Sequence, residues 1–212
     1  MAAGGHRPAR LSGVVGHRET GRVGLLGGSF NPAHRGHRHI SVEALRRLRL
    51  DEIWWLVSPQ NPLKASDGMA ALDARMARAR AVAAHPRIRV TDAERHFGTR
   101  YTVDTVAALR RRFPRVRFVW LMGADIMIQM PRWSRWPRLF GSLPVAVFAR
   151  PNYISRAMAG KAAHRFRRDR VPLSGAGGLA GHPPPAWTFI PIPLDDTSAT
   201  DIRTRLVCWP PR

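Results

Sequence analysis

The residues best suited to chemistry lie in one segment rich in glycine and histidine, Gly27-Gly-Ser-Phe-Asn-Pro-Ala-His-Arg-Gly-His37. Its glycines let the backbone turn tightly and approach a phosphate closely. His34 and His37 can both donate hydrogen bonds to phosphate oxygens. Because a helical pattern begins near Gly36, free N–H groups and the positive end of the helix dipole would face the same space. The segment therefore predicts a site for nucleotide phosphates.

Parts of this segment also have simpler interpretations. The glycines alone are typical of an ordinary turn, and the histidines could form a metal-binding pair with His39. No second ligand cluster accompanies them in the sequence, and a single cysteine, Cys208, excludes an internal disulfide and a cysteine-rich zinc site. Glycines, proline and both histidines in this order favour phosphate binding.

A second segment, Thr197-Ser-Ala-Thr-Asp-Ile-Arg203, combines hydroxyl groups with a permanent charge. Ser198 and Thr200 can cap a helix and also face an anion, and Arg203 adds a planar cation. A plain helix cap with a surface arginine is the alternative. Two phosphate-binding segments at opposite ends of one chain favour a fold that binds ATP over a fold that binds only a dinucleotide.

A third segment joins an acidic residue to aromatic ones. Gly123-Ala-Asp125 follows an apolar run, and Trp133 and Trp136 come soon after. An aspartate at a strand end can accept hydrogen bonds from ribose hydroxyls, although it could equally cap a helix. A tryptophan can stack on a flat ring, although core packing is the commoner role of any single one.

Two further stretches could bind an anion. Lys64, at the end of Asn61-Pro-Leu-Lys64, could pair with a phosphate or simply lie in a solvated loop. Tyr101-Thr-Val-Asp-Thr105 opens a predicted helix whose N–H groups and hydroxyls, those of Thr102 and Thr105, would favour an anion. Thr102 as a plain helix cap is an equally good interpretation.

The elements that must position these residues alternate along the chain. Apolar runs predict strands at 23–26, 53–57, 88–90, 116–122, 143–149 and 187–190, and helical patterns cover 37–50, 70–84, 102–113 and 200–208. This alternation predicts a Rossmann-like, doubly wound, mainly parallel α/β sheet with helices on both faces, in a single domain over 22–212. The segments 1–21 and 150–185 are expected to form a flexible extension and a helix with a mobile loop.

Charge and composition limit the remaining classes. The chain has 35 Lys and Arg against 14 Asp and Glu, a net charge of +21, which would attract nucleic acid or other polyanions. The arginines are spread along predicted helices, however, and phosphorylated small molecules would benefit from the same field. No apolar run approaches the roughly 18 residues of a membrane helix or resembles a secretory signal, so a cytoplasmic protein is expected.

The first segment resembles the His-x-Gly-His signature of the nucleotidylyltransferase superfamily. From about residue 23 to 205 the sequence is similar to the bacterial nicotinate-nucleotide adenylyltransferases. The resemblance implies that the loop holds the triphosphate of ATP, with Gly28, Ser29, Phe30 and Gly36 lining it and His34 and His37 contacting phosphates. Many family members have Asp where this chain has Asn31.

The other segments match the same family. Thr197–Arg203 resembles its Ile-Ser-Ser-Thr-x-Ile-Arg segment, which implies that Ser198, Thr200 and Arg203 grip the outer phosphates; Ala199 replaces a serine. The family's Gly-Ala-Asp…Trp pattern implies roles for Gly123 and Asp125 at the adenylate ribose. It also implies that Trp133 stacks on a pyridine ring while Trp136 is structural. The implied contacts of the acceptor are Lys64, Thr102, Thr105 and Trp133.

The resemblance implies transfer of AMP from ATP to nicotinate mononucleotide, giving deamido-NAD and pyrophosphate. His34, His37 and Arg203 would carry catalysis, and Mg²⁺ would arrive with ATP, without a dedicated protein metal site. No specific nucleic acid and no membrane is expected as a partner. One rival is a phosphopantetheine adenylyltransferase-like enzyme, which leaves Trp133 and the Tyr-Thr-x-x-Thr helix unexplained. A basic nucleic-acid-binding protein, the other rival, leaves both phosphate segments unexplained.

Overall fold

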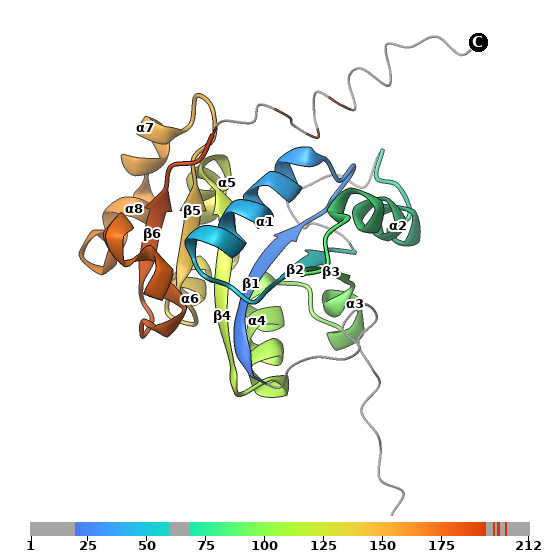
Figure 1. Cartoon of the computed structure of the whole chain (residues 1–212), viewed down its shortest axis with the longest axis horizontal. Helices are drawn as coiled ribbons and strands as arrows, with labels where there is room; N and C mark the ends of the chain where they lie inside the picture. The colour runs from blue at the N-terminus through green and yellow to red at the C-terminus, as the bar shows by residue number, and fades with distance from the viewer. Residues whose placement is uncertain (1–19, 60–67, 194–196, 198, 200–201, 203–212) are drawn as a thin grey trace, which may run out of the picture.

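Six parallel strands form one sheet in the order β3-β2-β1-β4-β5-β6 (Figure 1). This computed structural model describes residues 20–59 and 68–193, together with 197, 199 and 202. The strands are β1 (Gly21–Gly28), β2 (Glu52–Val57), β3 (Ile88–Thr91), β4 (Val116–Gly123), β5 (Val145–Phe148) and β6 (Trp187–Ile190). The order and parallel pairing confirm the predicted Rossmann-like sheet.

Helices cover both faces of the sheet, as predicted. One face packs against α1 (Arg35–Arg47), α2 (Leu72–Ala83) and the 3-10 helix η3 (Leu173–Gly181). Figure 1 shows α1 in front of the sheet and α4 behind it. The helices on the opposite face are α3 (Ala93–Phe97), α4 (Thr102–Arg112), α5 (Ala124–Gln129), η1 (Met130–Arg132), α6 (Trp136–Phe140), α7 (Ile154–Met158) and α8 (Lys161–Arg165).

The central strand β4 shows why both faces need cover. Val119 and Leu121 lie in the apolar cluster beneath α1, whereas Phe118 and Trp120 lie in the cluster beneath α4. Successive side chains of a strand point to opposite faces, so a continuous apolar run buries side chains on both.

The structure differs from the sequence prediction in short elements. The helices α3, α5 and α6 were not predicted, because five or six residues are too few for a periodic apolar stripe. Between 150 and 185 the predicted loop is wrong. That segment forms α7, α8, η2 (Arg167–Asp169) and η3, and η3 buries Ala176 and Leu179. The predicted helix at 200–208 lies outside the described residues apart from Ile202, which is helical.

The strand order reverses between β1 and β4. In such sheets the ligand crevice lies outside the carboxyl ends of the strands at this point. The segment 28–37 follows β1 and Asp125 follows β4. The fold therefore brings the first and third chemical segments to one place.

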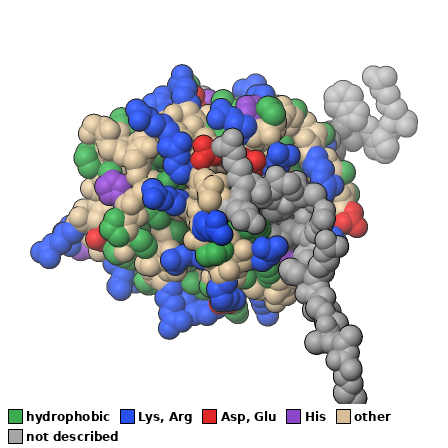
Figure 2. All heavy atoms as spheres, turned by 60° about the horizontal axis from the view of Figure 1, so that its bottom comes forward, with side chains coloured by type: hydrophobic (Ala, Val, Ile, Leu, Met, Phe, Trp, Pro, Cys, Tyr) green, Lys and Arg blue, Asp and Glu red, His purple; other side chains and the backbone are tan. Residues whose placement is uncertain are grey.

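Positive charge is spread over the face of the molecule shown in Figure 2. On the face in Figure 2, Lys and Arg side chains are scattered among apolar and polar ones, and few acidic side chains are visible. Within the described part of the chain, no helix is both long and apolar enough to cross a bilayer.

Candidate active site

The loop after β1 adopts an unusual backbone conformation. Phe30 has φ of +48°, a left-handed value that is costly for a bulky residue. Its ring is buried and stacks on Trp55 with centroids 5.0 Å apart, and it lies 4.6 Å from the ring of His37. These aromatic contacts hold the loop over the end of β2.

His34 and His37 lie together at the start of α1, as the segment predicts. His34 is the N-cap residue, with extended backbone angles of −148° and 170°, and the two ring centroids are 3.9 Å apart. The backbone N–H of His34 donates to Nδ1 of His37 at 3.2 Å. Nδ1 of His37 therefore carries a lone pair, and the proton of the neutral ring is on Nε2. That Nε2–H is a donor for an anion.

Asn31 connects this loop to the chain before α2. Its amide nitrogen donates to the carbonyl of Gly68 at 3.0 Å, and its amide oxygen accepts from the N–H of Ala70 at 3.3 Å. An aspartate could accept the second bond but could not donate the first. The two contacts explain why Asn suits this position in this chain.

The first and second chemical segments meet at Gly36. A Cβ there would lie 3.0 Å from Nδ1 of His34 and 3.2 Å from the carbonyl oxygen of Thr197, so only glycine fits without a shift. Nε of Arg35 also donates to Oγ1 of Thr197 at 3.0 Å. The second chemical segment therefore begins beside the first. The remaining residues predicted from it, Ser198, Thr200 and Arg203, lie outside the described residues.

Asp125 points toward a residue that the sequence analysis missed. It lies in the first turn of α5, whose N-cap is Gly123, so the alternative of Asp125 as the cap is wrong. Its Oδ1 lies 3.6 Å from Nε of Arg150, and Nη1 of Arg150 donates to the carbonyl of Thr197 at 3.3 Å. Arg150 thus joins the third segment to the second. Its only signal in the sequence is its place directly after the predicted strand 143–149.

We expect Arg150→Met to raise KM for ATP roughly 10-fold with a smaller change in kcat, because it removes a charged hydrogen-bond donor from the crevice. Steady-state kinetics with ATP varied would measure this. Arg156→Met, at an exposed arginine of α7, is the matched control and should change neither constant. An unchanged KM for ATP in Arg150→Met would remove Arg150 from the site.

Trp133 is partly buried and packs against the apolar cluster beneath α4. It contacts Trp120 edge-on with ring centroids 6.3 Å apart, and a Cβ on Gly27 would lie 2.5 Å from Cη2 of Trp120. Trp120 therefore contacts Trp133 and also lies beside Gly27 near the end of β1. Trp136 is partly buried and packs edge-on against Phe140 and Phe166.

The start of α4 differs from its prediction. Tyr101, and not Thr102, is the N-cap, and no side chain caps the helix. Thr105 is fully buried, and its hydroxyl pairs with the hydroxyl of Thr99 at 2.7 Å and the carbonyl of Tyr101 at 3.3 Å. An anion at the start of α4 would therefore meet the N–H groups of this helix more readily than the Thr105 hydroxyl. Lys64 lies outside the described residues.

Glu94 is a buried carboxylic acid near the carboxyl end of β2. Glu94 of α3 is 7% exposed, and burial raises its pKa to about 7, although a hydrogen bond with the side chain of Ser58 lowers it. The N–H of Ser58 in turn donates to the carbonyl of Gly28 at 2.9 Å. Nothing in the sequence patterns distinguished Glu94 from the surface carboxylates.

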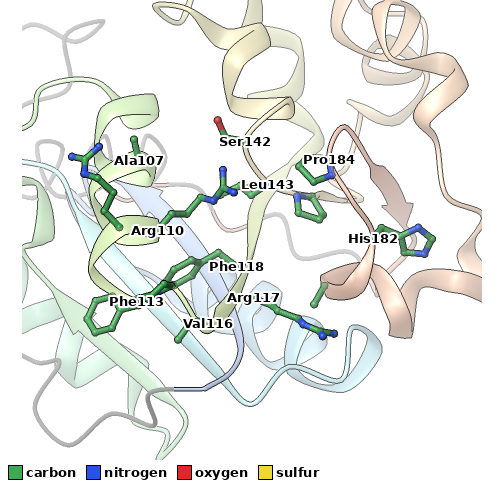
Figure 3. Close-up of a pocket in the computed structure, with 14 residues that line it drawn as sticks. Ala107, Arg110, Phe113, Val116, Arg117, Phe118, Ser142, Leu143, His182 and Pro184 are labelled. Atoms are coloured by element: carbon green, nitrogen blue, oxygen red, sulfur yellow. The ribbon is translucent and has the colours of Figure 1, made fainter.

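The cavity in Figure 3, of about 600 Å³, lies at the amino ends of the strands, opposite to their carboxyl ends. It is lined by the end of α4, the start of β4 and the turns before β5 and β6, including Arg110, Arg117, Leu143 and His182. It contains none of the predicted site residues. The candidate site lies at the carboxyl ends of β1 and β4, where residues of the three segments meet.

Comparisons with known proteins find similar sequences over most of the chain. A family model described as cytidylyltransferase-like matches residues 25–205. A relative from Cereibacter sphaeroides, named "Probable nicotinate-nucleotide adenylyltransferase", is 55% identical over 181 residues and covers 85% of this chain and 96% of the relative. A relative of the same name from Parvibaculum lavamentivorans is 52% identical over 184 residues, covering 87% and 92%.

Solved structures match in fold. The nicotinic acid mononucleotide adenylyltransferase of Plasmodium falciparum complexed with APC aligns with a TM-score of 0.63 at 15% identity, covering 87% of this chain and 83% of that one. The same enzyme complexed with NaAD aligns with a TM-score of 0.65 at 16% identity, covering 86% and 82%. At such low identity these two matches support the architecture alone.

Proposed function

Since the chain belongs to the cytidylyltransferase-like family, with relatives named nicotinate-nucleotide adenylyltransferase over half identical to it, we propose that it transfers AMP from ATP to nicotinate mononucleotide. The products are deamido-NAD and pyrophosphate. The observation that supports the proposal is the contact of Gly36 and Arg35 with Thr197, because it brings together two segments that are predicted to bind phosphate.

The reaction needs positioning and charge neutralisation more than proton transfer. A phosphate oxygen of the acceptor attacks the α-phosphorus in line, the bond from this phosphorus to the bridging oxygen breaks, and its electron pair leaves with pyrophosphate. Nε2–H of His37 and the N-terminal N–H groups of α1 would donate to the phosphates. His34 lies against His37, and Arg203 is proposed to neutralise the leaving phosphates.

Other residues would hold the nucleoside parts. Asp125, oriented by Arg150, is proposed to accept from the adenylate ribose, with Gly123 allowing close approach. Trp133 is proposed to stack on the pyridine ring. Lys64, Ser198 and Thr200 remain proposals from the family resemblance.

A divalent ion, Mg²⁺, is proposed to accompany ATP. Within the described residues, no group of three or more His, Cys, Asp or Glu side chains could hold a metal, and Asp125, the carboxylate at the crevice, is paired with Arg150. These donors suit an ion carried mainly by phosphates and water, which Mg²⁺ prefers. Bound there, it would neutralise charge on the leaving phosphates. A cytoplasmic location is proposed with this function.

We expect pyrophosphate release with ATP, Mg²⁺ and nicotinate mononucleotide, and a preference of roughly 10- to 100-fold in kcat/KM over nicotinamide mononucleotide. The acid offers a carboxylate to the N–H groups at the start of α4, and the amide loses the charge-assisted part of these bonds. Measuring pyrophosphate with each acceptor in turn tests both statements. Trp133→Ala should weaken both acceptors equally and leave ATP binding unchanged, because stacking does not depend on the ring substituent.

Three results would contradict parts of this proposal. Equal use of acid and amide would remove carboxylate recognition but leave adenylyl transfer standing. Turnover of phosphopantetheine in their place would favour the rival adenylyltransferase. No pyrophosphate with any acceptor, together with nucleic-acid binding that survives moderate salt, would favour a basic nucleic-acid-binding protein.

A further inference from the structure

Arg75 is a buried cation that the proposed reaction does not use. Arg75 belongs to α2 and is 3% exposed, and burial lowers the pKa of its guanidinium. Removing a charge from water costs several kcal/mol unless hydrogen bonds replace the lost hydration. Within the described part of the chain, its partners include no carboxylate.

Arg75 donates instead to four backbone carbonyls. Nη1 contacts the oxygens of Ser29 at 2.6 Å and Ser58 at 2.7 Å. Nη2 contacts the oxygen of Pro59 at 2.9 Å, and Nε that of Ala70 at 2.8 Å. These carbonyls belong to the loop after β1, the end of β2 and the chain before α2. One planar side chain therefore ties three segments together around the crevice.

The bond to Ser29 fixes the peptide group that leads into Phe30. In a trans peptide the carbonyl and the following N–H point in opposite directions, so the N–H of Phe30 points away from the buried guanidinium. The left-handed φ of Phe30 persists only when its surroundings hold it. Arg75, which binds the carbonyl of Ser29, and the rings of Trp55 and His37, which contact the ring of Phe30, provide that restraint.

We propose that Arg75 is a positioning residue, which holds the Ser29–Phe30 peptide so that its N–H is presented to the phosphates of ATP. The inference rests on the proposed function for the identity of that anion. Arg75 acts through the backbone and does not touch the substrate. Without it the loop can relax, and a donor that was fixed before binding must be ordered during the reaction.

The test compares Arg75→Lys with Arg78→Lys. The first variant keeps a charge but loses the planar set of donors, and the second changes an exposed arginine on the same helix. We expect Arg75→Lys to weaken binding of a non-hydrolysable ATP analogue, measured by calorimetry, and to lower kcat, each roughly 10-fold. Arg78→Lys should change neither. In Arg75→Ala, guanidinium at a non-denaturing concentration should restore part of kcat by filling the vacated space.

A lower melting temperature with unchanged analogue affinity and kcat in Arg75→Lys would overturn the inference, because Arg75 would then only stabilise the fold. Folded Arg75→Ala whose kcat does not respond to guanidinium would also overturn it. The proposed function fails by a different result, a wild-type protein that releases no pyrophosphate with any acceptor. In that case the analogue affinities still decide the role of Arg75.

Discussion

His37→Ala should lower kcat roughly 10²-fold, about 2.7 kcal/mol, the usual effect of removing one preorganised donor to developing charge. The reason is geometric: Nδ1 of His37 accepts from the N–H of His34, which puts the proton of the neutral ring on Nε2, the atom proposed to donate to a phosphate. The same change removes an interaction that caps α1, so the free energy of unfolding should fall by about 1 kcal/mol. Steady-state kinetics and thermal melting measure the two effects.

His37→Asn separates the two effects. The amide oxygen of Asn can still accept from His34, while the donor at the position of Nε2 is lost. It should therefore match the alanine variant in kcat and the wild type in stability. His39→Ala is the control on the same helix, because its ring contacts the carbonyl of Pro193 at 2.7 Å and is not one of the predicted site residues. Wild-type kcat in His37→Asn would show that His37 only caps the helix.

Glu94→Gln should stabilise the protein at pH 8.5 by about 3 kcal/mol and much less at pH 5. The folded pKa of Glu94 is about 7 against 4.5 for the free side chain, and each unit corresponds to about 1.4 kcal/mol. Below 4.5 both states are protonated, so no energy is lost. As pH rises from 4.5 to 7 the unfolded state ionises first, and stability falls until the folded carboxyl also ionises. Glutamine removes this loss and can keep the bond to Ser58.

Chemical denaturation at the two pH values would measure this difference. Glu43→Gln is an informative control because its sign is opposite. Burial raises the pKa of Glu43, but hydrogen bonds and charge from Arg47 and Arg46 outweigh it and the net pKa is lowered. Its ionised form is therefore stabilising, and the glutamine variant should be less stable at pH 8.5. A stability gain in Glu94→Gln that is the same at pH 5 and pH 8.5 would contradict an ionisation effect.

The sequence predicts the sheet well because its strands are continuous apolar runs. β6 agrees with its predicted range, and the five other strands agree within two residues at each end. His34 and His37 were found because their spacing places both on one helical turn. Arg75 and Arg150 were not found. An arginine that binds backbone carbonyls or a carboxylate at a strand end cannot be distinguished in the sequence from the many exposed arginines. Thr105 shows the opposite error: a hydroxyl at a helix start can serve the protein interior.

The contact between Arg35 and Thr197 spans 162 residues of chain. During synthesis His34 and His37 leave the ribosome early, and the sheet is complete once β6 has emerged. The first and second chemical segments come together only when the chain beyond β6 reaches α1. Because such distant contacts form after local ones, a nascent chain that ends at β6 would have its parallel sheet but not the assembled candidate site.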